Sequence, residues 1–85
     1  MPTERCVCRC KDLPPFTAED IQKVERYLGL GLSPQDSDRL LEGTNVELRE
    51  HCDITLGDPI LTARIAISHL REDNMYYSKL KAAGL

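Results

Sequence analysis

The sequence is poor in aromatic side chains, with no tryptophan, one phenylalanine and three tyrosines among its 85 residues. The core of the folded protein must therefore be mainly aliphatic. A chain of this length forms a single domain with a thin core, and such small domains are only marginally stable. Apolar residues make up 41% and charged residues 29% of the chain, which is ordinary for a globular protein and too apolar for intrinsic disorder.

Long apolar runs are also missing. No segment approaches the roughly 20 residues that a membrane-spanning helix requires. The first residues, MPTERCVC, lack the apolar stretch of a signal peptide. We therefore expect a cytoplasmic protein with no membrane partner, whose cysteines are reduced and either bind a metal or stay as free thiols.

Positive charge is not concentrated anywhere in the chain, and the formal net charge is −3. Binding to a nucleic-acid backbone requires a clustered basic face, so the charge balance argues against a nucleic-acid partner. The sequence also contains no Ser–His–Asp set, no phosphate-binding glycine loop and no dinucleotide fingerprint. We therefore expect no enzymatic activity.

Three of the four cysteines alternate in the segment CVCRC, at Cys6, Cys8 and Cys10. Alternate side chains of an extended strand point to one side, so these thiols could converge, with Cys52 as a fourth ligand. Four thiolates would form a closed, tetrahedral zinc site of the structural kind. The spacing differs from the usual two pairs of nearby cysteines, so the alternative is an arm with free thiols. A redox role would require a Cys-x-x-Cys motif, which is absent.

The chain divides into an arm and a helical domain. Residues 1–15 are polar, carry the three alternating cysteines and end in two prolines, which disfavour a helix and predict an extended arm. From residue 16 onward, apolar residues recur at helical spacing, and no segment alternates as a strand does. We predict an all-α fold, in which residues 16–85 form a compact bundle of four or five short helices behind the cysteine-bearing arm.

Each predicted helix begins with a residue whose side chain can cap the helix N-terminus. These caps are Thr17, Ser33, Asp58 and Asn74. Gly43 either ends the second helix or marks a break in it, with Thr44 and Glu47 as a further capping box. Residues 53–58 are predicted to be a loop.

Two pairs of histidine and glutamate are spaced to share a helical face. Glu47 and His51 are four residues apart, and His69 and Glu72 are three apart. If their helices pack together, these side chains could form a metal site of the kind found inside helical bundles, and three of them could hold a metal-bound water. The alternative is that each histidine interacts with the dipole at a helix C-terminus and that Glu72 pairs with surface cations.

Tyr76 and Tyr77 are adjacent in the last predicted helix, so their side chains point about a quarter turn apart. One can pack in the core with its hydroxyl hydrogen-bonded, while the other covers a neighbour or a partner. Both are therefore candidate partner-binding residues.

Residues 43–80 carry polar and apolar residues at fixed offsets. A glycine and a Val-Glu-Leu…Glu-His run are followed by Thr, Asp-Pro, Ile-Ala-x-x-His-Leu-x-Glu and Tyr-Tyr-x-x-Leu. This pattern resembles an uncharacterised family of small helical proteins of bacteria and phages, catalogued as a domain of unknown function. The matching residues are Gly43, Val46, Glu47, Leu48, Glu50, His51, Thr55, Asp58, Pro59, Thr62, Ile65, Ala66, His69, Leu70, Glu72, Tyr76, Tyr77 and Leu80.

The chain departs from this pattern at Arg49, an additional residue that rotates His51 by about 100° around the helix. The CVCRC arm has no counterpart in the pattern. The resemblance implies a small helical domain that is often encoded by phages, and it implies no activity.

Two functions follow from these observations. The first is a non-enzymatic interaction or structural module, such as a phage-particle component or a regulator, which binds a protein partner or assembles with itself in the cytoplasm or the virion. The second is a metal-binding protein, with zinc held by the cysteines or an ion held between the histidines and glutamates.

Overall fold

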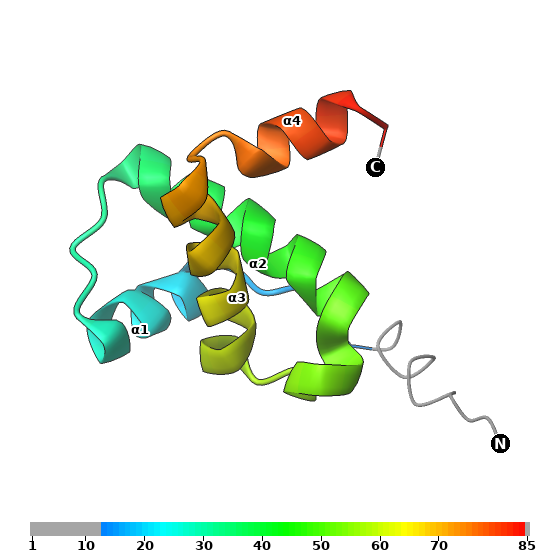
Figure 1. Ribbon diagram of the computed structural model, residues 1–85. Coiled ribbons are helices and arrows are strands. Elements are labelled where there is room, and N and C mark those ends of the chain that lie inside the picture. The colour runs from blue at the N-terminus through cyan, green and yellow to red at the C-terminus, as the bar shows by residue number, and fades with distance from the viewer. Residues whose placement is uncertain (1–12, 85) are drawn as a thin grey trace, which may run out of the picture.

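The computed structural model describes residues 13–84. Within them the chain forms four helices and no strand, so the predicted all-α fold is confirmed (Figure 1). The helices are α1 (Ala18–Leu28), α2 (Pro34–Thr55), α3 (Pro59–Glu72) and α4 (Tyr76–Ala82). The CVCRC segment lies outside the described residues, so the extended arm stays a prediction.

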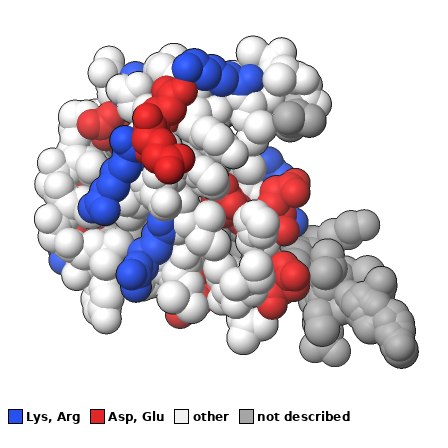
Figure 2. All heavy atoms as spheres, viewed as in Figure 1, with Lys and Arg blue, Asp and Glu red and all other residues white. Residues whose placement is uncertain are grey.

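Helix α2 is the longest element, and the other three helices pack against it. Helix α3 crosses α2 and makes its most extensive contact there, while α1 lies beside both. The short helix α4 folds back over α2 and α3 at one end of the molecule (Figure 1). Acidic and basic side chains are interspersed on the face that Figure 2 shows, without a single large basic area.

The main core is aliphatic except for one tyrosine, as the composition predicts. Its buried members are Ile21, Val24, Leu40, Ala63, Ala66 and Tyr77. The two alanines let α3 approach α2 closely, because they add little volume between the helices. Two threonines are also fully buried, and both are satisfied: Thr44 donates to Leu40 O, and Thr62 donates to Asp58 O, each over 2.6 Å.

Three of the predicted helix caps are confirmed. Thr17 and Asp20 form a reciprocal capping box at the start of α1. Ser33 accepts from the backbone N–H of Asp36, and Asp58 accepts from two backbone N–H groups of α3. These side chains satisfy N–H groups that a helix start leaves without partners.

The predicted break at Gly43 is wrong, because α2 continues through it. The predicted loop at 53–58 is also too long, because α2 is helical as far as Thr55. Thr44 does not begin a new helix and instead donates its hydroxyl to the carbonyl of Leu40, one turn back. Packing of the buried face of α2 against the other helices outweighs the poor helix propensity of one glycine.

The predicted cap at Asn74 is wrong as well. Helix α4 begins after Met75, whose side chain makes no cap hydrogen bond. The turn before α4 is organised by Asp73, which accepts from the Met75 N–H over 2.9 Å and from Lys79 Nζ over 2.6 Å. The Lys79 hydrogen bond lowers the pKa of the Asp73 carboxyl.

The segment before α1 is held against α2 by the side chain of Asn45, which pairs with the backbone of Phe16. Asn45 Oδ1 accepts from the Phe16 N–H over 2.7 Å, and Asn45 Nδ2 donates to Phe16 O over 3.1 Å. The Phe16 ring packs against Leu48 and Cys52 in a second, smaller cluster. None of the helices in residues 13–84 is long and apolar enough to cross a membrane.

Candidate functional site

A buried carboxylate lies at the centre of the main polar cluster. Glu47 of α2 is only 4% exposed. Its Oε2 accepts a hydrogen bond of 2.6 Å from the hydroxyl of Tyr77, which comes from α4. Burial, followed by this hydrogen bond to a carboxylate, raises the pKa of the Tyr77 phenol well above its ordinary value. Tyr77 therefore remains a hydrogen-bond donor to Glu47.

Two histidines approach the same carboxylate from different helices. His51 Nε2 lies 3.5 Å from Glu47 Oε1, and His69 Nε2 lies 3.6 Å from Glu47 Oε2. Both distances are longer than an ordinary hydrogen bond. Among the described residues, Tyr77 supplies the one hydrogen bond that Glu47 receives through its side chain.

Aromatic rings hold His69 in place. Its imidazole stacks on the ring of Tyr76, with centroids 4.2 Å apart and planes 3° from parallel. Tyr77 meets both rings edge-on, 4.9 Å from Tyr76 and 6.1 Å from His69. The three rings therefore fix the direction from which His69 faces Glu47.

The ring of Tyr77 packs directly against Gly43 of α2. A Cβ atom at this position would lie 2.7 Å from Cδ2 and 2.9 Å from Cζ of the Tyr77 ring, closer than real contacts allow. The absence of a side chain thus lets the Tyr77 ring lie directly on α2. The signal for this role in the sequence is a glycine inside a helical pattern, which can mark a close approach as well as the predicted break.

His51 lies where the helical backbone is interrupted. Its φ of −132° and ψ of 21° depart from helical values. Its imidazole nevertheless remains beside Glu47, one turn back. The rotation that the additional Arg49 implies does not separate His51 from the cluster.

The cluster lines an open hollow of about 750 Å³ between α2, α3 and α4. Its polar rim includes charged side chains of both signs. The other polar residues that line it are Glu42, Asn45, Arg49, Glu50 and Lys81.

The structure thus brings together three of the four helical residues predicted as metal ligands: Glu47, His51 and His69. It does not bring Glu72 to them. Glu72 is exposed and lines a different hollow, together with Arg64. Within residues 13–84, no three His, Cys, Asp or Glu side chains already stand in a metal-binding arrangement.

Only one cysteine of the predicted thiolate site lies in the part of the chain that the structure describes. Cys52 is 6% exposed and disulfide-bonded, which differs from the expectation of reduced cysteines. Cys6, Cys8 and Cys10 lie outside residues 13–84. The zinc hypothesis for the cysteines therefore stays a prediction.

The two candidate partner-binding tyrosines have different environments. Tyr77 is 3% exposed and belongs to the core, so it offers no surface to a partner. Tyr76 is partly exposed and covers His69. Tyr77 is thus the core tyrosine and Tyr76 the one that covers a neighbour, and binding of a partner by Tyr76 stays a prediction.

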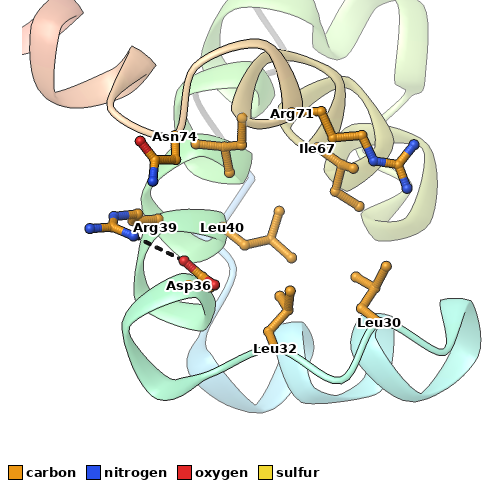
Figure 3. A pocket seen from close by; sticks show the side chains of 9 residues that line it. Leu30, Leu32, Asp36, Arg39, Leu40, Ile67, Arg71 and Asn74 are labelled. Atoms are coloured by element: carbon orange, nitrogen blue, oxygen red, sulfur yellow. Dashed lines mark hydrogen bonds and ion pairs between the residues drawn. The ribbon is translucent and has the colours of Figure 1, made fainter.

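A second, more apolar hollow of about 330 Å³ lies between the α1–α2 connection, α2 and α3 (Figure 3). Leu30, Leu32, Leu40 and Ile67 point into it. At its rim, Arg39 Nη1 pairs with Asp36 Oδ1 over 2.9 Å, so these two charges compensate each other.

Apolar side chains are exposed where α2 turns into α3. We call this surface the turn patch, and its members are Leu13 (40% exposed), Ile54 (68%), Leu56 (84%) and Leu61 (48%). Leu13 is included because its side chain lies beside Gly57 in this turn. A Cβ atom placed on Gly57 would be 2.9 Å from Leu13 Cδ1. Leu56 is also the one residue other than glycine with a positive φ in the described part of the chain, at 57°.

Fold and site together define a small all-α protein with a carboxylate–histidine–tyrosine cluster on a helical scaffold. The chain belongs to the family "Protein of unknown function (DUF5661)", whose model matches residues 20–83. The resemblance to an uncharacterised family of small proteins is thereby confirmed. Neither the curated proteins nor the solved structures contain a match to the chain.

Proposed function

We propose that the protein is a non-enzymatic interaction module that docks through the turn patch. The main observation behind this proposal is the backbone conformation and the exposure of Leu56. Its backbone is left-handed, with φ 57°, and its side chain is 84% exposed. The left-handed conformation costs a residue with a Cβ about 1–2 kcal/mol. The exposed side chain recovers none of the roughly 1.5–3 kcal/mol that burial of a leucine provides.

Glycine or asparagine is the usual residue at this kind of helix end, and either would relieve the backbone strain. A large apolar side chain at a strained, exposed position is unfavourable for the isolated fold. Residues in strained backbone conformations cluster at functional sites, which supports a functional role for Leu56. A second surface that covers Leu56 would turn the exposed side chain into a buried contact.

The neighbours of Leu56 extend this surface. Ile54 stands on the last turn of α2, Leu61 on the first turn of α3, and Leu13 lies against Gly57 between them. The largest exposed apolar patch on a monomer is often functional, and larger patches commonly mark protein-binding surfaces. Four exposed apolar side chains at one end of a domain support such a role.

The partner that we propose first is a second copy of the chain. An apolar patch is complementary to itself, and most soluble oligomers are symmetric assemblies of one chain, with two-fold dimers the commonest. A phage-particle component, the setting that the family resemblance suggests, would require such contacts between copies.

Sedimentation equilibrium of the full chain and of Leu56→Asn tests the proposal. We expect the wild-type chain to associate and Leu56→Asn to be monomeric, with a melting temperature equal to or above that of the dissociated wild type. Asparagine tolerates the left-handed conformation, so unfolding would not account for the loss of association.

Tyr27→Asn is the matched control, because Tyr27 is 75% exposed on α1 and outside the turn patch. It should leave the association unchanged. A wild-type chain that remains monomeric at the highest attainable concentration would overturn self-association through the patch. An assembly that survives Leu56→Asn would do the same.

A further inference from the structure

The Glu47 carboxylate is buried, but it receives fewer hydrogen bonds than a buried carboxylate normally does. An ionised carboxylate can accept about four hydrogen bonds, and burying one is costly unless it is paired. Glu47 is 4% exposed, yet among the described residues its side chain receives one hydrogen bond, from Tyr77. The remaining acceptor positions face the imidazoles of His51 and His69.

The distances from the carboxylate to the two imidazoles are informative. They are 3.5 Å and 3.6 Å, too long for strong hydrogen bonds. Two ligand atoms that are each about 2.0–2.2 Å from one tetrahedral zinc ion lie about 3.3–3.6 Å apart. Each spacing therefore fits a pair of neighbouring zinc ligands, His51 with Oε1 and His69 with Oε2 of Glu47.

We propose that Glu47, His51 and His69 bind one divalent transition-metal ion, with zinc as the preferred ion. Two imidazoles and one carboxylate are a common ligand set for zinc in sites that keep a fourth position open. The hollow of about 750 Å³ in front of the cluster leaves room for a water molecule at that position. This inference is independent of docking through the turn patch.

Supporting side chains already surround the three ligands. The Tyr77 hydroxyl holds Glu47 Oε2, and the Tyr76 ring stacks on His69, so two ligands are oriented by neighbours. Contacts of this kind tune ligand direction and metal affinity. The ligand that must move is His51, because the three groups do not yet surround one point. Its side chain is 45% exposed and lies at the interrupted end of α2, so a change of rotamer meets little packing.

Titration of the full chain with Co²⁺ and Zn²⁺, in a mild reductant, tests the site. Cobalt gives visible absorption bands in a tetrahedral site and a strong near-ultraviolet band when thiolates are ligands. We expect one ion per chain with the visible bands and without the thiolate band. Zinc should displace cobalt, as isothermal titration calorimetry can follow.

Variants assign the ligands. We expect His69→Ala and Glu47→Gln to abolish this binding, and His51→Ala to weaken it at least about tenfold. Tyr77→Phe should weaken it roughly 10–100-fold, as loss of a ligand's hydrogen-bond partner does. Glu50→Gln and Glu72→Gln are matched controls, because both residues are exposed and neither is a proposed ligand. Circular dichroism of each variant shows whether the helices are intact.

Three outcomes would overturn the proposal. One is the absence of zinc binding by the wild-type chain at millimolar metal. The second is binding that survives His69→Ala in a folded variant. The third is cobalt binding that shows the thiolate band and disappears with Cys8→Ser, which would assign the metal to the cysteines instead.

Discussion

Tyr77 of α4 donates its hydroxyl to Glu47 Oε2 of α2 over 2.6 Å, between positions that are 30 residues apart. This bond lies in the core and joins the shortest helix to the longest one. A helix of seven residues without a side-chain cap is not stable by itself in water. The position of α4 therefore depends on its packing against α2 and α3, to which the Tyr77 bond contributes.

Replacement of Tyr77 by phenylalanine tests how much this bond contributes. The variant keeps the ring but leaves the buried Glu47 carboxylate without its hydrogen bond. We expect the free energy of unfolding, measured by urea denaturation, to fall by about 1–3 kcal/mol. Tyr76→Phe is the control, because the Tyr76 hydroxyl makes no hydrogen bond among the described residues and should be nearly neutral. Equal losses in the two variants would contradict a special role for the Tyr77 hydroxyl.

Stability should also depend on pH in the alkaline range. Burial and the Glu47 hydrogen bond raise the pKa of Tyr77 above its ordinary value of 10.0, so the folded state favours the protonated phenol. The stability linked to this group is therefore fully present below about pH 10 and is lost as the pH rises above it. We expect one of the three tyrosines to ionise only on unfolding, as tyrosinate absorbance would report. The loss of stability at alkaline pH should be smaller in Tyr77→Phe than in the wild type. If both proteins lost stability equally with rising pH, Tyr77 would not be the group responsible.

Gly43→Ala separates helix propensity from packing. Alanine favours a helix over glycine by about 1 kcal/mol, so an isolated α2 would be stabilised. In the folded protein the new Cβ would lie 2.7 Å from Tyr77 Cδ2, and the ring has to move. We expect a net loss of about 1–3 kcal/mol in thermal or urea unfolding, as overpacked cores show. Glu42→Ala, at the exposed neighbouring position, should leave stability almost unchanged. A stabilised Gly43→Ala variant would mean that Tyr77 does not rest on α2.

Local sequence signals predicted the helical class and the start of three helices. Thr17, Ser33 and Asp58 cap helices because their side chains reach backbone N–H groups two or three residues away, and this needs no distant contact. The same local signals failed at Gly43, where the outcome depends on a residue far along the chain, and at Asn74, where a neighbouring side chain takes its place. Tyr77 approaches Gly43 from another helix, and Asp73, held by Lys79, replaces Asn74 in the turn.

At the candidate site too, local spacing predicted one contact correctly, and tertiary packing decided the others. Spacing alone placed Glu47 and His51 on one face of α2, and the structure keeps them together. Spacing also paired His69 with Glu72, but α3 turns His69 toward Glu47 and leaves Glu72 at a different hollow. Three residues along a helix are about 60° apart around its axis, so one of the pair can face a neighbouring helix while the other faces water.

The sequence by itself determined that the chain folds into helices with an aliphatic core, because composition, periodicity and caps are local properties. The tertiary structure decided which polar side chains meet. Glu47, His69 and Tyr77 come from three helices, and only the packing of α3 and α4 on α2 brings them within contact. It also decided that Leu56 is left-handed and exposed, because Leu56 caps the end of α2 where the chain reverses toward α3.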